Sequence, residues 1–506
     1  MGIEADERAL GDLSRGNVFL GIELGSTRIK ASLIDSSCRQ ISSGSFEWEN
    51  RLEDGVWTYR LEDAVAGIQA CYADLVSRTR GDFGVTPKSY RAIGVSGMMH
   101  GYLALDAEGR LLSPFRTWRN TMTGEAAEKL SAVFSLNIPQ RWSVAHLYHS
   151  VLRHEAHVER IARLTTLAGY VHWLLTGEHV AGIDEASGMF PVDTETRRFH
   201  PRMLESFDKL VEERGYPWKL GEILPRVAVA GESAGKLTRE GALLLDPTGT
   251  LEDGIPLCPP EGDAGTGMVA TNSVGTHTGN VSVGTSVFAM VVLDKGLSRP
   301  YREIDLVMTP AGDPVAMVHC NNGTGDIDGW LRFIGDCLKA CGMEPDQERL
   351  YRTLFQAAAL GEPDCGGLVN CNYLSGEHIT GFAEGRPMFL RLPDARFTAA
   401  NFMRAQLYSV FASLRIGMEI LTDREAVRID RLNGHGGFFR AEGIGRRAMA
   451  AALKAPVTTM ENAGEGGPWG MAILAAYMAQ KEGGETLEEY LSGRVFAGIG
   501  RTTDVP

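Results

Sequence analysis

The chain has 506 residues, which is too many for one hydrophobic core and suggests two or three domains. Its 64 Asp and Glu residues outnumber its 50 Lys and Arg residues, so the formal net charge is -14 and the isoelectric point is near 5.4. This balance argues against a surface that binds nucleic acid or anionic lipid, because such binding needs a net basic face.

The eight cysteines are scattered without a C-x-x-C pair, which indicates neither a zinc site nor a disulfide framework. The longest apolar runs, such as "MAILAAYMA" and "VFAMVVL", are much shorter than the roughly 18 residues that a membrane span needs. The polar N-terminus lacks the apolar region of a signal peptide. We therefore expect a soluble, cytoplasmic protein with free thiols and no membrane partner.

The first predicted elements form a hairpin. Alternating apolar residues in "VFLGIELG" and "RIKASLID" predict two strands joined by Gly25, Ser26 and Thr27. Glu23 lies in the middle of the first strand, although burying an unpaired carboxylate is costly. It must either reach solvent or face a cationic group. A helix beginning near Leu61 and a short buried strand, "RAIGVSG", follow.

The second half of the chain repeats this design. The segment "TGNVSVGTSVFAMVVLD" reads as two apolar strands joined by Gly284, Thr285 and Ser286. A Gly-rich turn and a helix capped by Asp263 place the junction between the halves close to residue 271. A long helix is expected over residues 401–421, and the glycines of "NGHGGFF" interrupt the pattern after it. We predict two α/β lobes of one plan.

Each hairpin tip presents backbone N–H groups that can hold an anion, and the small residues let a phosphate approach closely. Two such tips facing each other would hold a polyphosphate, and a magnesium ion beside it would compensate the carboxylate of Glu23. Taken singly, each tip is better explained by an ordinary hairpin turn. The duplication favours the phosphate-binding interpretation.

Six segments, in order, carry a family resemblance: "GIELGSTRIK", "VSGMMHG", "AGYVHWLLTGE" with "DEASGM", "GDAGTGM", "GNVSVGTS" and "NGHGGFF". Together they resemble the FGGY family of carbohydrate kinases over essentially the whole chain, and "VSGMMHG" is similar to the sugar-binding motif of xylulokinases. The resemblance implies two ribonuclease-H-like (actin-like ATPase) domains, over residues 18–270 and 271–506, with an interlobe cleft.

The resemblance assigns the sugar site. Asp263 would be the catalytic carboxylate, which orients the attacking hydroxyl and accepts its proton; the alternative is a plain helix cap. Met99, His100, Trp118 and Asn120 would bind the sugar together with Asp263. The alternatives are a buried structural histidine, a core tryptophan and a turn asparagine.

The resemblance also implies ATP and Mg²⁺ as cofactors. Glu23 and Asp263 would hold the metal. The remaining nucleotide contacts would come from the two hairpin tips and the glycine loop: Gly25, Ser26 and Thr27 for the first phosphate motif, Gly284 and Thr285 for the γ-phosphate side, and Gly436 and Gly437 for adenosine. Lys30 is equally well read as a solvated side chain or as a site residue.

The expected activity is ATP-dependent phosphorylation of the terminal hydroxyl of a ketopentose, D-xylulose first. Departures from the family pattern, Glu23 for Asp, Met98 for Gln and Arg119-Asn120 for Asn-Asp, leave the sugar open: L-ribulose or another ketose or polyol is the alternative. A non-kinase, nucleotide-switch ATPase of the same fold is a further alternative. The partners expected are a small sugar and ATP, with a homodimer left open. Family members continue past "VFAGIG", so a trimmed C-terminus is expected.

Overall fold

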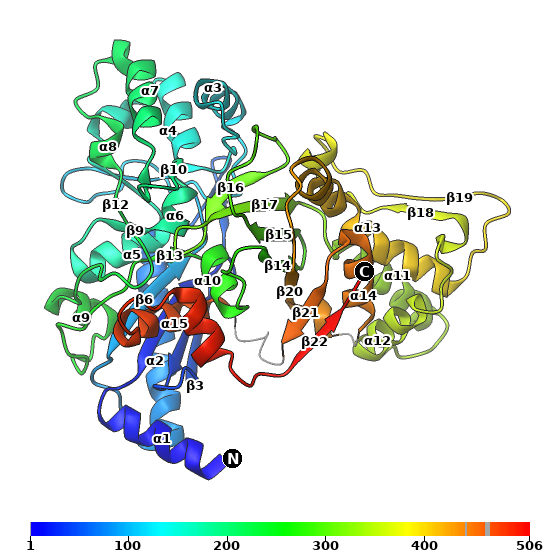
Figure 1. Ribbon diagram of the computed structural model, residues 1–506, viewed down its shortest axis with the longest axis horizontal. Coiled ribbons are helices and arrows are strands. Elements are labelled where there is room, and N and C mark those ends of the chain that lie inside the picture. The colour runs from blue at the N-terminus through cyan, green and yellow to red at the C-terminus, as the bar shows by residue number, and fades with distance from the viewer. Residues whose placement is uncertain (1, 441–442, 461–465) are drawn as a thin grey trace. The chain divides into compact units, whose positions relative to one another are not determined.

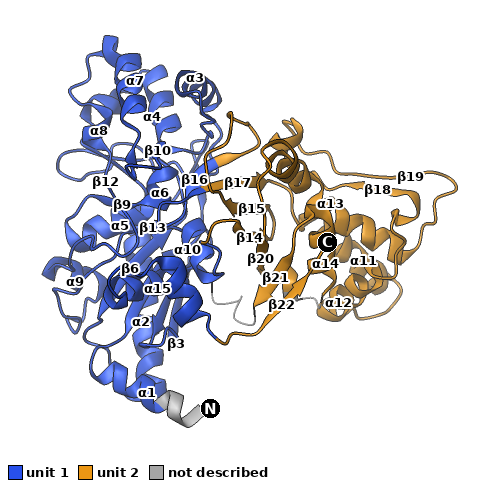
Figure 2. Ribbon diagram, in the orientation of Figure 1, with its two compact units in different colours: residues 1–274, 306–314, 465–497 blue, residues 275–305, 315–464, 498–506 orange. Residues whose placement is uncertain are grey.

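The computed structural model describes residues 2–440, 443–460 and 466–506, and Figure 1 shows the course of the chain. The chain divides into two compact units (Figure 2). Unit 1 contains residues 1–274, 306–314 and 465–497, and unit 2 contains residues 275–305, 315–464 and 498–506. Each unit combines helices with a mixed sheet, which confirms the α/β class expected from the sequence.

Three separate segments of the chain form unit 1. Its first long segment ends at residue 274, close to the junction expected near residue 271. Residues 465–497 nevertheless belong to unit 1, because helix α15 (Gly466–Gln480) packs against strands β1 (Phe19–Leu24) and β6 (Ala92–Gly97). The compact units therefore divide the chain differently from the two continuous segments, 18–270 and 271–506, that the sequence suggests.

Unit 1 is built on a five-stranded sheet of order β3-β2-β1-β6-β13. β1 pairs antiparallel with β2 and parallel with β6, β2 pairs antiparallel with β3, and β13 runs parallel to β6. Short two-stranded sheets accompany it. Besides β1 and β6, the strands are β2 (Arg28–Ile34), β3 (Gln40–Glu47), β4 (Arg51–Glu53), β5 (Val56–Thr58), β7 (Leu103–Leu105), β8 (Arg163–Thr165), β9 (Val180–Gly182), β10 (Val192–Asp193), β11 (Arg198–Phe199), β12 (Arg226–Ala228) and β13 (Glu261–Gly262).

The helices of unit 1 pack on this sheet or on one another. Besides α15, they are α1 (Gly2–Ser14), α2 (Leu61–Phe83), α3 (Gly124–Phe134), α4 (Ser143–Leu152), α5 (Leu167–Thr176), α6 (Ile183–Ser187), α7 (Pro201–Val211), α8 (Leu220–Ile223), α9 (Arg239–Leu245), α10 (Asp263–Ala270) and α16 (Leu487–Tyr490). Two 3-10 turns, η1 (Ala156–Arg160) and η2 (Glu212–Arg214), and a π-helical turn, η7 (Leu491–Val495), complete the unit.

The two faces of β1 are covered by different helices, because successive residues of a strand point to opposite sides. Leu20, Ile22 and Leu24 belong to a buried core that includes apolar residues of α2. Gly21 lies on the other face, where a Cβ atom would come within 2.2 Å of the Pro468 carbonyl oxygen of α15. Only glycine permits this approach. Glu23 shares that face with Gly21.

Unit 2 contains most of a seven-stranded sheet of order β16-β17-β15-β14-β20-β21-β22. β14 pairs antiparallel with β15 and parallel with β20, β15 pairs antiparallel with β17, and β20 runs parallel to β21. A separate two-stranded sheet joins β18 and β19. The strands are β14 (Thr278–Val283), β15 (Val287–Val292), β16 (Asp305–Met308), β17 (Pro314–Cys320), β18 (Leu368–Cys371), β19 (Met388–Arg391), β20 (Arg431–His435), β21 (Val457–Met460) and β22 (Arg501–Asp504).

The helices of unit 2 include the long one expected over residues 401–421. It is α13 (Ala399–Glu419), and a π-helical turn, η5 (Ile420–Arg424), extends it. The others are α11 (Gly325–Ala340), α12 (Gln347–Ala358) and α14 (Ile444–Leu453), with 3-10 turns η3 (Cys365–Gly367), η4 (His378–Thr380) and η6 (Gly437–Arg440).

The two large sheets repeat one topology. The order β3-β2-β1-β6-β13 in unit 1 matches β17-β15-β14-β20-β21 in unit 2, and in both a three-stranded antiparallel part is followed by two parallel strands. The repetition confirms the single lobe plan predicted from the two hairpins, which is that of a ribonuclease-H-like domain. Among the residues described, no helix is both long and apolar enough to span a membrane.

Candidate active site

Three strands of unit 1 end at one edge of its sheet. β1, β6 and β13 run parallel, with Leu24 opposite Gly97 and Gly97 opposite Gly262. The segments that leave them begin with Gly25, Met98 and Asp263, so residues far apart in the sequence come together at this edge (Figure 1).

Asp263 is the first residue of α10, directly after β13. Its Oδ1 accepts a hydrogen bond of 3.2 Å from the backbone N–H of Met99. The side chain reaches solvent, yet the surrounding protein desolvates the carboxylate and raises its pKa, against the opposing effect of nearby backbone N–H groups. A carboxylate that a ligand can reach and whose pKa is raised toward neutrality suits a general base.

The expectation that Asp263 caps its own helix is wrong. The N-cap position of α10 is Gly262, and the acceptor comes from α6: Oδ2 of Asp184 accepts hydrogen bonds of 3.1 Å from the N–H groups of Gly262 and Gly265. Asp184 is fully buried, which raises its pKa, and the charge of Asp263 raises that pKa further. Because a neighbouring helix supplies the cap, the Asp263 carboxylate is available for other contacts.

Glu23 lies on the same side of the sheet, and its side chain is 7% exposed. Burial raises its pKa to about 7, Lys30 on β2 lowers it and Asp263 raises it. Its carboxylate accepts no hydrogen bond from the residues described, and it packs so closely on Gly467 that a Cβ atom there would overlap it. Glu23 therefore does not point freely to solvent. Near Asp263 it is a carboxylate without a hydrogen-bonding partner among the described residues.

Met99 and His100 form a strained turn after β6. His100 has a φ of +72° and Gly101 a φ of +96°. Residues other than glycine rarely adopt this backbone conformation. The Nδ1–H of His100 donates to the Gly188 carbonyl oxygen at 3.2 Å, since that oxygen can only accept. A Cβ atom on Gly188 would lie 2.5 Å from Nδ1. The "DEASGM" segment thus supports the turn that carries both predicted sugar-binding residues.

Trp118 and Asn120 differ in their exposure to solvent. Trp118 is 38% exposed, so it is not a core tryptophan. Asn120 is buried, and its carboxamide accepts from the N–H of Trp57 at 2.9 Å and donates to the Trp57 carbonyl at 2.8 Å. These bonds give Asn120 a structural role. The guanidinium of Arg119 lies 4.1 Å from the centre of the Trp57 ring.

Two more carboxylates are buried behind Asp263. Glu185 on α6 and Glu261 on β13 both have their pKa raised by burial, and the Asp184 charge adds to the effect on each. Oε2 of Glu261 accepts from the Glu185 N–H at 3.3 Å. Sequence analysis included Asp184 and Glu185 in the motif "DEASGM" without giving either a role, and it did not single out Glu261. The position of Glu261 two residues before Asp263 is the only signal that could have found it.

The first hairpin tip has its carbonyl groups fixed from behind. The Trp48 indole N–H donates to the Gly25 carbonyl at 2.7 Å, and the Tyr59 hydroxyl donates to the Ser26 carbonyl at 2.6 Å. The Gly25 N–H closes the turn on the Arg28 carbonyl. Among the residues described, the N–H groups of Ser26 and Thr27 have no backbone acceptor, and both residues are exposed.

The second hairpin tip, in unit 2, repeats this arrangement. The Gly284 N–H donates to the Ser286 carbonyl, while the N–H groups of Gly323 and Thr324 donate to the Thr285 and Gly284 carbonyls at 2.7 and 2.8 Å. Gly284 and Thr285 are exposed, and the Thr285 N–H has no backbone acceptor in the described part of the chain.

The glycine loop after β20 adjoins this second tip. Gly436 has a φ of +104°, and a Cβ atom on it would lie 3.0 Å from the Val283 carbonyl oxygen of β14. Gly437 opens the 3-10 turn η6. Within unit 2, the predicted phosphate and adenosine residues therefore lie at one edge of the sheet, because β14 and β20 run parallel.

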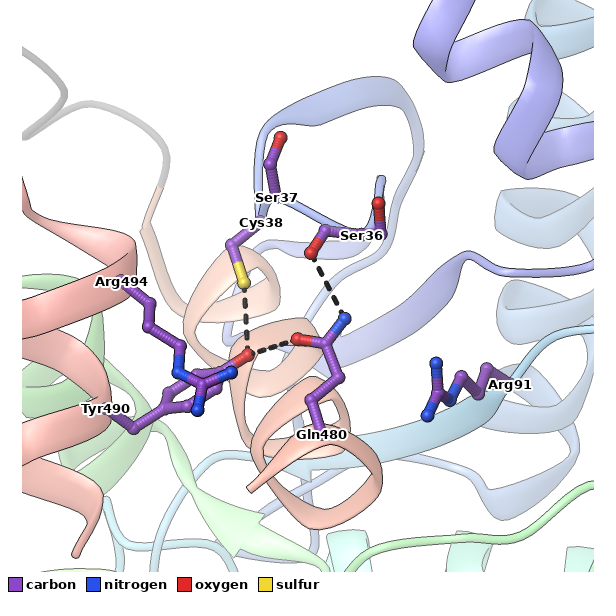
Figure 3. Close-up of a pocket in the computed structure, with 7 residues that line it drawn as sticks. All are labelled: Ser36, Ser37, Cys38, Arg91, Gln480, Tyr490 and Arg494. Carbon is purple, nitrogen blue, oxygen red and sulfur yellow. Dashed lines mark hydrogen bonds between the residues drawn. The ribbon is translucent and has the colours of Figure 1, made fainter. Parts of the chain in front are cut away.

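Unit 1 also contains a cavity away from these residues. It has a volume of about 440 Å³ and is lined by Ser36, Ser37, Cys38, Arg91, Gln480, Tyr490 and Arg494 (Figure 3). Ser36 to Cys38 follow β2, at the sheet edge opposite Gly25. Hydrogen bonds join some of its polar groups: the Tyr490 hydroxyl donates to Gln480 at 2.7 Å, and the Gln480 amide donates to the Ser36 carbonyl at 3.1 Å. We interpret it as structural.

Comparison with known proteins decides the family. Residues 18–269 match the N-terminal domain, and residues 279–479 the C-terminal domain, of the FGGY family of carbohydrate kinases. The chain belongs to this family. It is thus a carbohydrate kinase, and the resemblance drawn from the six motifs is confirmed.

FGGY relatives extend over most of the chain. A xylulose kinase from Haemophilus influenzae is 22% identical over 424 residues, which cover 80% of this chain and 79% of that protein. The ligand-bound xylulose kinase from Lactobacillus acidophilus has a TM-score of 0.79 at 17% identity and covers 97% of this chain and 94% of its own. A gluconate kinase from Lactobacillus acidophilus has a TM-score of 0.78 at 16% identity, with coverage of 97% and 93%. At such identities the solved structures establish the fold.

Proposed function

We propose that this FGGY kinase transfers the terminal phosphate of ATP to a 2-ketopentose, and to D-xylulose in preference. The observation that carries the proposal is the 3.2 Å hydrogen bond from the Met99 N–H to Asp263. It joins the sugar motif "SGMMHG" to the catalytic carboxylate. Xylulose kinases also stand among the relatives that match over most of their length.

Asp263 would act as the general base. Its Oδ2 would accept the proton of the terminal sugar hydroxyl while that oxygen attacks the γ-phosphorus, and the bond to the β-phosphate oxygen would break to release ADP. The Met99 N–H holds Oδ1, which orients the carboxyl plane. Asp184 fixes the start of α10 and so fixes the backbone of Asp263.

The hairpin tips would bind the phosphates. The N–H groups of Ser26 and Thr27 in unit 1, and of Thr285 in unit 2, are available for this because they have no backbone acceptor among the described residues. Gly436 and Gly437 would lie against the adenosine.

The residues at the active site fit a magnesium ion. The carboxylate of Glu23 lacks a hydrogen-bond donor among the described residues, and Mg²⁺ is usually held by one or two carboxylates, water and phosphate oxygens. In the described part of the chain no three His, Cys, Asp or Glu side chains form a metal site on their own. Glu23 and Asp263 would hold the ion, which would neutralise charge on the phosphates.

A panel of sugars tests the proposal. Formation of ADP should rise most steeply with D-xylulose, less with L-ribulose, L-fuculose or gluconate, and least with glycerol at equal concentration. A preference for glycerol would refute the ketopentose assignment. An ATPase rate that no sugar changes would refute sugar phosphorylation.

We also propose a cytoplasmic location, because all eight cysteines are free thiols, as is typical of a reducing compartment.

A further inference from the structure

A buried carboxylate in unit 2 takes no part in the mechanism above. Glu377 lies in the connection between β18 and β19, and its side chain is 0% exposed. Its backbone is fixed as well, because it exchanges two hydrogen bonds with Phe382, of 2.7 and 3.0 Å. Glutamate is almost never fully buried unless its charge is compensated. Its surroundings therefore need an explanation.

Three N–H groups stabilise one of its two carboxylate oxygens. Oε2 of Glu377 accepts from the backbone N–H groups of Asn321 and Asn322, at 3.0 and 3.3 Å, and from the Asn322 side-chain amide at 3.1 Å. Hydrogen bonds to a charged acceptor are roughly twice as strong as neutral ones. Glu377 therefore holds the loop that connects β17 to α11.

The same loop holds the second hairpin tip. The next two residues, Gly323 and Thr324, donate their N–H groups to the carbonyls of Thr285 and Gly284. The Thr324 hydroxyl adds a bond of 3.2 Å to the Gly284 carbonyl. The approach is so close that a Cβ atom on Gly323 would lie 2.2 Å from that carbonyl oxygen. A shift of the loop would therefore move the tip.

Other polar residues make the loop rigid. The Asn372 side-chain amide donates to the carbonyls of Asn322 and Gly323 at 3.4 and 3.0 Å. The Asn322 side chain accepts from the Ser375 N–H at 2.9 Å and donates to the Ser375 carbonyl at 3.2 Å. Residues 372–377 thus brace residues 321–324, and Glu377 supplies the only charge among these bonds between described residues.

We propose that Glu377 is a positioning residue for the phosphate hairpin at Gly284 and Thr285. It would act through residues 321–324 and keep the Thr285 N–H directed toward the terminal phosphate of ATP. This inference rests on the proposed function, because it takes this hairpin to bind the nucleotide.

The test compares Glu377→Gln with Glu384→Gln in the full-length protein. Glutamine keeps the size and one acceptor oxygen but removes the charge. Glu384 lies in the same connection, is exposed and pairs with the exposed Arg386, so its variant controls for loss of one acid on this surface. The measurements are the Kd for a non-hydrolysable ATP analogue, the Kd for ADP, the Kd for sugar alone, and kcat and KM.

We expect Glu377→Gln to raise the Kd for the ATP analogue about tenfold, the usual difference between charged and neutral hydrogen bonds. The Kd for ADP should rise less, the Kd for sugar should not change, and the KM for ATP should rise. Glu384→Gln should match wild type. An equal rise in the Kd for all three ligands, together with a lower melting temperature, would show a merely structural role and overturn the proposal. An unchanged ratio of ATP-analogue to ADP affinity would also overturn it.

A second variant keeps the proposal testable if Glu377→Gln does not fold. Thr324→Val removes only the hydroxyl bond to the Gly284 carbonyl, and it should shift the ratio of ATP-analogue to ADP affinity in the same direction by a smaller factor. No shift would overturn the link between loop and hairpin. Failure of wild-type protein to phosphorylate any sugar would refute the proposed function separately, because the binding measurements need no turnover.

Discussion

Asp263 and Glu23 show how similar carboxylates acquire different properties from their surroundings. Asp263 reaches solvent and receives the Met99 N–H, whereas Glu23 is nearly buried without a hydrogen-bond donor among the described residues. Desolvation raises the pKa of both. A carboxylate that the protein compensates only in part at an active site is typical of a group whose partner arrives with the substrate.

Replacing Asp263 by Asn should lower turnover by about 10²- to 10⁴-fold, the usual contribution of a positioned general base. The amide can still orient the hydroxyl but cannot accept its proton. Binding of sugar and of ATP should stay close to wild type, as isothermal titration would show. A variant with near-normal kcat would disprove the catalytic assignment.

Glu23→Gln should fold normally and be slightly more stable in metal-free buffer, because the costly buried charge is gone. With MgATP it should lose phosphoryl transfer. Glu23→Asp should retain activity if water mediates the metal contact. The measurement is a magnesium titration of activity for all three proteins, and an unchanged magnesium dependence in the Gln variant would disprove the metal role.

His146 on α4 predicts a pH dependence of stability. Neither ring nitrogen has a hydrogen-bond partner in the described part of the chain, and burial, then Arg116 and His149, lower its pKa to about 3. The unfolded chain binds this proton below about pH 6.5 and the folded protein does not, so stability falls as the pH falls through this window.

His146→Phe should therefore lose less stability on acidification than wild type. At pH 4.5 the difference should reach about 2.7 kcal/mol, because this pH lies two units below the unfolded pKa of about 6.5 and each unit corresponds to about 1.36 kcal/mol. Urea unfolding at pH 7.5 and pH 4.5 measures it. An equal fall in the free energy of unfolding of wild type and His146→Phe between the two pH values would contradict the prediction.

At the scale of elements, α10 depends on a neighbour. Asp184→Ala should remove the acceptor for the Gly262 and Gly265 N–H groups, lower the free energy of unfolding by about 1–2 kcal/mol and lower kcat, because Asp263 opens that helix. Asp346→Ala is a matched control. Asp346 caps α12 by accepting from Arg349 at 3.0 Å, so its loss should lower stability without a comparable fall in kcat. Equal effects on kcat would contradict the argument.

Elements with a local signal were predictable from the sequence. The two hairpins follow from period-two alternation around Gly-Ser-Thr and Gly-Thr-Ser, and α13 from its apolar spacing. Contacts made by distant residues were not. Nothing in the sequence near Asp263 shows that Asp184 caps its helix, or that Asn120 holds the backbone of Trp57, because such hydrogen bonds depend on tertiary packing.

At the scale of the whole molecule, unit 1 needs a segment from near the end of the chain. α15 is apolar and almost wholly buried, and it covers the sheet face that carries Gly21 and Gly94. Residues 1–274 expressed alone should therefore aggregate or unfold without a sharp transition. Co-expression with residues 466–497 should restore a cooperative transition, measured by circular dichroism. A stable, cooperative 1–274 fragment would contradict this.

The late position of α15 also affects the order in which the protein is made. A ribosome must add about 200 residues after residue 274 before α15 is complete, which takes on the order of ten to forty seconds at 5–20 residues per second. During that interval one face of the nascent first sheet lacks its cover while unit 2 emerges. The sheet that carries Glu23 and the strand leading to Asp263 thus gains this helical cover only after most of unit 2 has been made.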